Sequence, residues 1–139
     1  MKVRKFVTLT LWSLFVIGAA SLYAQSVHEL RVKIPFEFVV SNKTMEAGEY
    51  SLQTVATALQ IRQRNGHLVA MVPYNSSPKA ETFNEGQLLF HRYGDTYFLS
   101  EISMPFSNIG NKLFQTKRER ELAQAGSSRQ ELAVTVRSR

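Results

Sequence analysis

The amino-acid sequence predicts an all-β protein: a small antiparallel β-sandwich or flattened barrel of about seven strands, with one short C-terminal helix and a preceding signal peptide. Three observations support this prediction. Apolar residues recur at every second position in several short segments, turn-forming residues separate these segments, and the pattern changes period only in a charged stretch near the end of the chain. A period of two places alternate side chains on one face of a strand.

The first 24 residues are organised like a cleavable export signal. Three basic residues within positions 2–5 precede an uncharged run, residues 6–24, that ends in small side chains. We expect cleavage after Ala24, with a cut after Ala20 as the alternative, and therefore a bacterial protein exported to the periplasm or the medium. An uncleaved membrane anchor is less favoured, because threonine and serine dilute the apolar run.

Cleavage would leave residues 25–139 as one β-rich domain. The chain of 139 residues contains no cysteine, so we expect packing and strand pairing to stabilise the domain without disulfides. Three of the six net positive charges belong to the signal, and residues 25–111 carry seven basic and eight acidic side chains, whereas residues 112–139 carry seven and three. The basic character thus lies in the tail, and we expect no nucleic-acid partner.

The longest alternation covers residues 30–40. Pro35 interrupts it and lacks a backbone N–H, which indicates an edge strand, a bulge or two separate strands. A second strand is expected from Tyr50 to Thr54, after the break at Ala47-Gly48.

Two hairpins are predicted from short turn signals. Asn65-Gly66 favours a type I′ turn, after which Pro73 should end the ladder and residues 74–84 should form a loop. Gly94-Asp95 favours a type II′ turn between two aromatic-rich strands with apolar groups on both faces, so this hairpin should form the centre of the core. The predicted pairs are Leu59 with Val72, Ile61 with Ala70, Arg62 with Val69, Phe90 with Leu99, His91 with Phe98, and Arg92 with Tyr97.

The C-terminal region changes period. Thr116 and Glu119 form a capping box, so a helix is expected over residues 117–125, with Gly126 as its stop. Alternation then returns and predicts a last strand over about residues 131–137.

Four ordered segments stand out along the chain: IPFEFVV from Ile34, MEAGEYSL from Met45, FHRYGDTYFLSEI from Phe90 and KRERELA from Lys117. Together they resemble a family of small exported proteins that are numerous in acidobacteria and related soil bacteria. The resemblance spans about residues 32–123, although many relatives have Leu-Pro where this chain has Met45-Glu46, and Asp in place of Glu37. It implies export and a common β-rich fold, and it carries over no functional residue.

The residue types that carry catalysis or metal binding form no recognisable constellation. The three histidines, His28, His67 and His91, have no short ligand spacing, and the only aspartate, Asp95, occupies a turn position. No serine lies in a Gly-x-Ser-x-Gly segment, and the glycines are isolated. We therefore predict no catalytic residue, no metal, no cofactor and no enzymatic activity.

Two sets of charged residues have a functional alternative. The carboxylate pairs Glu46/Glu49 and Glu81/Glu85 could serve sugar hydrolysis, but both pairs lie in turn-rich segments where solvated charge is the simpler interpretation. A basic cluster could contact polyanions or lipid headgroups, but alternation with Glu119 and Glu121 favours a solvated helix face. The residues of this cluster are Lys112, Lys117, Arg118 and Arg120.

The sequence therefore favours an exported, non-enzymatic β-domain that binds an envelope or extracellular partner, or supports the envelope. It should have no membrane span once the signal is cleaved. Two alternatives remain: a secreted hydrolase acting on polysaccharide or peptide, and an adhesion module that binds anionic polymers or headgroups through its basic tail.

Overall fold

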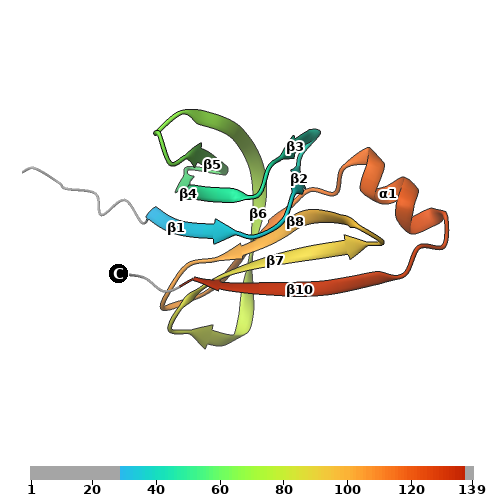
Figure 1. Ribbon diagram of the computed structural model, residues 1–139. Coiled ribbons are helices and arrows are strands. Elements are labelled where there is room, and N and C mark those ends of the chain that lie inside the picture. Colours follow the sequence, from blue (N-terminus) through green and yellow to red (C-terminus); the bar gives the residue numbers. More distant parts are fainter. Residues whose placement is uncertain (1–28, 137–139) are drawn as a thin grey trace, which may run out of the picture.

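The computed structural model describes residues 29–136, which form ten strands and one helix (Figure 1). The predicted signal peptide, its cleavage site and His28 lie outside the described residues. The elements are β1 (Glu29–Ile34), β2 (Phe38–Val40), β3 (Lys43–Met45), β4 (Gly48–Val55), β5 (Ala58–Gln63), β6 (Leu68–Phe83), β7 (Gly86–Tyr93), β8 (Thr96–Ser103), β9 (Ser107–Leu113), α1 (Lys117–Gln124) and β10 (Arg129–Val136).

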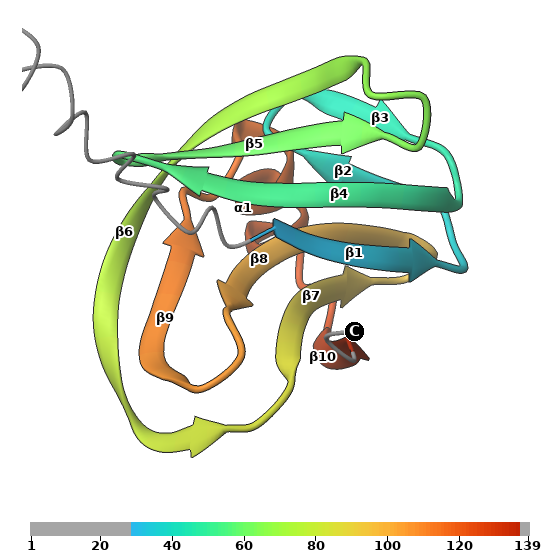
Figure 2. The same ribbon diagram turned by 90° about the vertical axis from the view of Figure 1, so that its left-hand side faces the viewer.

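The strands form one open, mixed sheet. Its main order is β1-β4-β5-β6-β9-β8-β2-β3, while β7 pairs with the other side of β8 and β10 pairs with β7. The β2–β8 pair is parallel, and the other pairs are antiparallel. Strand β6 has 16 residues and pairs first with β5 and then with β9. Figure 2 shows how β6 curves around the molecule from one layer of strands to the other.

The main core lies between these layers. Its apolar side chains come from β1, β4 and β5 on one side and from β7 and β8 on the other. Phe90 is fully buried, and its ring meets those of Phe36 and Phe38 edge to face at 5.0 and 5.7 Å. Burial of large aromatic groups on this scale dominates the stability of a small domain.

The all-β prediction is confirmed. The strands form one open, mixed sheet of ten strands, however, and not the predicted antiparallel sandwich or flattened barrel of about seven. The strands beyond the predicted number are β2, β3 and β9. Pro35 divides the first alternation into β1 and β2, which is one of the three expected outcomes. Residues 74–84 were expected to be a loop, yet residues up to Phe83 belong to β6.

Pro73 is the last residue of β6 that pairs with β5, so that ladder ends there as predicted, but the strand itself continues because β6 changes partners. Ala58 pairs with Pro73, and from Tyr74 onward β6 pairs with β9. A residue without an N–H is tolerated at such a transition, where one ladder stops and another begins. The residues that follow are mostly polar, and they are exposed or half-buried. The sequence therefore lacks the alternation of apolar and polar residues that would indicate a strand.

The β5–β6 hairpin follows the predicted register only in part. Ile61 pairs with Ala70 and Leu59 with Val72 as expected, but a bulge shifts Arg62 onto Leu68. The turn is longer than the type I′ form. Only its glycine has a positive φ, of 85° at Gly66, and the backbone N–H of residue 63 donates to the carbonyl of residue 67 at 2.9 Å.

The β7–β8 hairpin has all three predicted pairs, and Gly94 has a φ of 60°. One face of this hairpin joins the main core, as predicted. The other carries Phe98 and Tyr93, which pack with Val39 of β2 and Leu122 of α1 in a second, smaller cluster. Helix α1 therefore covers the second face of the central hairpin.

Helix α1 begins and ends close to the predicted residues. The Thr116 hydroxyl accepts a hydrogen bond from the Glu119 N–H at 3.0 Å, which confirms this half of the capping box. Gly126 has a φ of 81° just beyond the helix. The chain then returns as β10 along β7, between residues 129 and 136.

Candidate functional site

An open groove lies between β3, the start of β4 and the β5–β6 hairpin. Its volume is about 870 Å³, which is within the range of small-molecule and peptide sites. Residues 43–50 form one wall, and residues 63–65 with Val69 form the other. The Lys43 ammonium spans the two walls by donating to the Val69 carbonyl at 2.9 Å.

Charged groups of both signs line the groove. Arg64 pairs with Glu49 at 3.4 Å, and both side chains are at least half exposed. Glu46 is exposed, and its carbonyl accepts a hydrogen bond from the Tyr50 hydroxyl at 2.6 Å. Burial and the nearby Glu46 carboxylate raise the pKa of Tyr50.

The predicted carboxylate pairs thus have different surroundings. Glu46 and Glu49 both line the groove, which their spacing in a turn-rich segment did not indicate. Glu81 is exposed on β6, whereas Glu85 lies in the β6–β7 turn beside a smaller depression of about 480 Å³.

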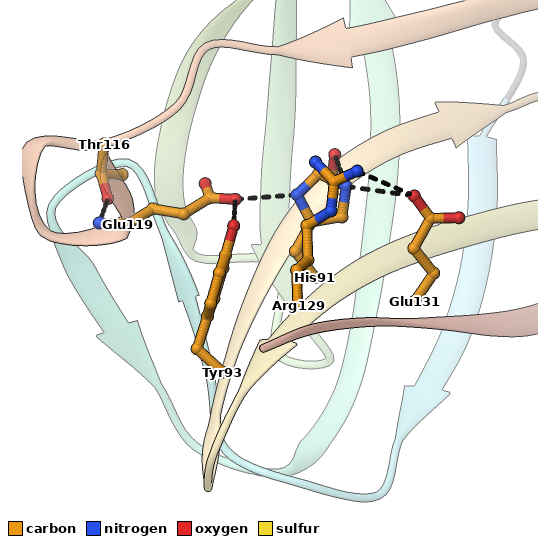
Figure 3. Close-up of polar contacts among 7 residues, drawn as sticks. His91, Tyr93, Thr116, Glu119, Arg129 and Glu131 are labelled. Atoms are coloured by element: carbon orange, nitrogen blue, oxygen red, sulfur yellow. Dashed lines mark hydrogen bonds and ion pairs between the residues drawn. The ribbon is translucent and has the colours of Figure 1, made fainter. Parts of the chain in front are cut away.

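A second polar feature is a buried cluster beneath α1. The His91 side chain projects from β7, and its Nδ1 lies 2.8 Å from Oε1 of Glu119 on the helix. Only 8% of His91 and 3% of Glu119 are exposed. Figure 3 shows Glu119 pointing inward to meet His91 and Tyr93, away from the outer face of the helix.

Three further groups contact this pair. Tyr93 donates a long hydrogen bond of 3.4 Å to the same Glu119 oxygen, and burial, followed by the Glu119 charge, raises the pKa of Tyr93. Ser100 Oγ lies 3.1 Å from His91 Nε2. Glu131 of β10 lies 3.8 Å from the same nitrogen and 3.9 Å from Arg129.

Sequence reasoning placed His91 in the hairpin as a partly buried aromatic residue, but it missed the constellation. Ser100 is 9 residues from His91, and Glu119 is 28 residues away. The β7–β8 hairpin brings Ser100 beside His91, whereas docking of α1 on the sheet brings Glu119 there. The sequence indicated Glu119 only as the third helical residue of the capping box, not as a partner of His91.

The predicted polyanion cluster lies on the outside of the C-terminal region. Lys112 is exposed on β9, and the three basic residues of α1 are also exposed. Lys117 pairs with Glu121 at 3.8 Å. Because Glu119 turns inward, Glu121 is the only acidic side chain of α1 that faces solvent with them.

Within residues 29–136, no group of three or more histidine, aspartate or glutamate side chains could hold a metal ion. In the same range, no helix is long and apolar enough to cross a membrane. Asp95 lies in the β7–β8 turn with its side chain in solvent, 3.8 Å from Arg92.

Comparisons with protein-family models, curated proteins and solved structures give no significant match.

Proposed function

We propose that this chain is an exported, non-enzymatic binding module that holds an extended peptide segment of an envelope or extracellular partner in the groove beside β3. The observation that carries the proposal is the position of the groove along an exposed strand edge. Among the described strands, β3 pairs with β2 alone, and all three residues of β3 line the groove.

A strand edge with one partner retains unpaired backbone N–H and C=O groups. An extended peptide can pair with such groups and place alternate side chains in pockets on either side. The groove offers Lys43 and Arg64 to acidic side chains and Glu46 to basic ones. This combination suits a polar peptide, because the backbone supplies affinity and the charges select the sequence.

Peptide is a better match than carbohydrate for this lining. Tyr50 is the only aromatic residue among the groove residues, only 5% of it is exposed, and its hydroxyl is already bonded to the neighbouring backbone. It therefore presents no ring face on which a sugar could stack.

The hydrolase alternative draws on one specific observation, the presence of Glu46 and Glu49 in the same groove. Glycoside hydrolysis needs two carboxylates on opposite sides of the scissile bond. Glu46 and Glu49 lie on the same wall, and Arg64 engages Glu49, so we favour binding over hydrolysis. The resemblance to exported acidobacterial proteins agrees with an envelope role and remains part of the proposal.

Panning of short random peptides against residues 25–139 tests the proposal. Peptides enriched on the wild-type protein should lose binding to the double variant Lys43→Glu/Arg64→Glu. Arg31→Glu is the matched control, because Arg31 is an exposed arginine of β1 outside the groove. Absence of enrichment, or equal binding to both variants, would contradict a peptide groove, and release of sugars from polysaccharide by the wild-type protein would favour the hydrolase.

A further inference from the structure

The cluster beneath α1 contains the ordered elements of an activated nucleophile. The hydroxyl of Ser100 lies 3.1 Å from Nε2 of His91, and the opposite ring nitrogen, Nδ1, lies 2.8 Å from the Glu119 carboxylate. A nucleophile, a base and an acid that orients the base are thus joined in one chain of hydrogen bonds, each from a different element of the fold.

Glu119 determines how the imidazole is protonated. An ionised carboxylate only accepts hydrogen bonds, so it requires a proton on Nδ1 of His91. The neutral ring then has a lone pair on Nε2, which accepts the proton of the Ser100 hydroxyl. Both Glu119 and His91 are more than nine-tenths buried, so water competes little for these bonds.

Ser100 has an unusual position in its strand. Phe90 of β7 pairs with Leu99 and Leu89 pairs with Glu101, so Ser100 is the extra residue of a β-bulge. Bulges re-aim a side chain and recur next to active sites. Ser100 is half-buried, whereas the two groups behind it are buried, so the serine is the most exposed member of the hydrogen-bonded chain.

A second carboxylate lies near Nε2, the ring nitrogen of His91 that faces Ser100. Oε1 of Glu131 lies 3.8 Å from Nε2, and 55% of its side chain is exposed. When His91 takes up the serine proton, the imidazolium carries a positive charge between Glu119 and Glu131. Two carboxylates then lie against the charge that develops during the reaction.

We propose that Ser100 is an activated nucleophile. Its hydroxyl reacts with activated carboxylic esters and becomes acylated. In this step Ser100 Oγ attacks the ester carbonyl carbon while its proton passes to Nε2 of His91. The carbon–oxygen bond to the leaving alcohol then breaks, and the alcohol takes the proton from Nε2. The products are O-acyl-Ser100 and free alcohol, without an oxidant or a reductant. This chemistry is independent of the groove beside β3.

The test uses residues 25–139 and p-nitrophenyl acetate. We expect a burst of one equivalent of p-nitrophenolate, a mass increase of one acetyl group, and the acetyl group on Ser100 in peptide mapping. Ser100→Ala should remove the burst. His91→Gln should slow it about 100-fold, the usual contribution of a general base. Ser107→Ala, a change at a serine of β9 outside the cluster, should leave it unchanged.

Two controls keep the result interpretable. Each variant is first shown to be folded by its near-ultraviolet circular dichroism, because His91 is buried. If His91→Gln does not fold, the loss of the burst in Ser100→Ala and the position of the acetyl group in the wild-type protein carry the test. A folded wild-type protein without acetyl on Ser100, a label on lysine instead, or an equal burst in Ser100→Ala would overturn the proposal.

Discussion

The Glu119 carboxylate lies 2.8 Å from Nδ1 of His91, although 28 residues separate the two along the chain. This contact joins helix α1 to strand β7, and both side chains are buried. Burial of a charge costs free energy unless a partner compensates for it. The position of α1 on the sheet therefore depends on both residues, and the same pair orients the imidazole toward Ser100.

The first prediction compares two glutamates of α1. Glu119→Ala should lower the free energy of unfolding by about 1 to 3 kcal/mol, because it leaves the Nδ1–H donor of His91 buried without its partner. Glu121→Ala is the matched control, since 62% of that side chain is exposed; it should change stability by less than about 0.5 kcal/mol. Urea unfolding of both variants measures the difference. Equal losses of stability would mean that Glu119 does not stabilise the packing of α1 on the sheet.

The second prediction concerns alkaline pH. The folded protein holds the pKa of Tyr93 above its ordinary value, chiefly by burial and then by the Glu119 charge. A tyrosine pKa that is higher in the folded than in the unfolded protein stabilises the fold. This contribution is fully present below the pKa of the unfolded chain, about 10, and it is lost as pH rises through the pKa of the folded protein. Tyr93→Phe should therefore lose less stability than wild type between neutral pH and pH above about 10. Urea unfolding at both pH values measures this, and identical losses would contradict it.

The third prediction tests the cluster between α1 and the central hairpin. Phe98 is 1% exposed and meets Tyr93 edge to face at 5.9 Å. Phe98→Ala should cost about 3 to 5 kcal/mol by leaving a cavity, a large part of the roughly 5 to 15 kcal/mol available to a domain. Phe114→Ala is the control, since Phe114 is 57% exposed. Thermal melting that shifts equally in both variants would show that the hairpin is misplaced.

The accuracy of the sequence-based prediction depended on how local each interaction is. The β7–β8 register and the Thr116 cap follow from a turn or a single helix end, so nearby residues were sufficient to predict them. The parallel β2–β8 pair and the change of partner within β6 depend on distant segments. No local pattern encodes them, because their free energy comes from contacts that form only in the complete sheet.

The candidate sites follow the same rule. Glu46 and Glu49 were recognised as a pair, but only the fold places them in a groove with Arg64. No local motif links His91, Ser100 and Glu119. Ser100 lies in no Gly-x-Ser-x-Gly segment, because a bulge in β8 sets its position. Strand geometry predicts which face a residue occupies, but not which helix will cover that face.

The fourth prediction concerns export. Basic residues before an uncharged run that ends in small side chains should direct cleavage after Ala24. Protein recovered from the periplasm or the medium should then begin at Gln25, or at Ser21 if cleavage follows Ala20. Its N-terminal sequence decides between them. An intact Met1 in the membrane fraction would show that the segment is an anchor.

The last prediction concerns the outer face of α1. Glu119 points inward, which removes one of the two acidic residues expected to interrupt the basic run. Glu121 remains and pairs with Lys117, so we still expect a solvated face that binds no anionic polymer or vesicle at about 0.15 M salt.

Two sets of changes separate the structural role of this segment from a binding role. Thr116→Ala should cost about 0.5 to 2 kcal/mol, because it removes the hydroxyl that accepts from Glu119 N–H. Changing Lys117, Arg118 and Arg120 together to Gln should leave the melting temperature nearly unchanged, since these side chains are exposed. The binding measurement uses heparin and anionic vesicles over a range of salt concentrations. Polyanion binding releases condensed counterions and must weaken steeply with salt, so salt-sensitive binding that the triple variant loses would establish the adhesion function instead.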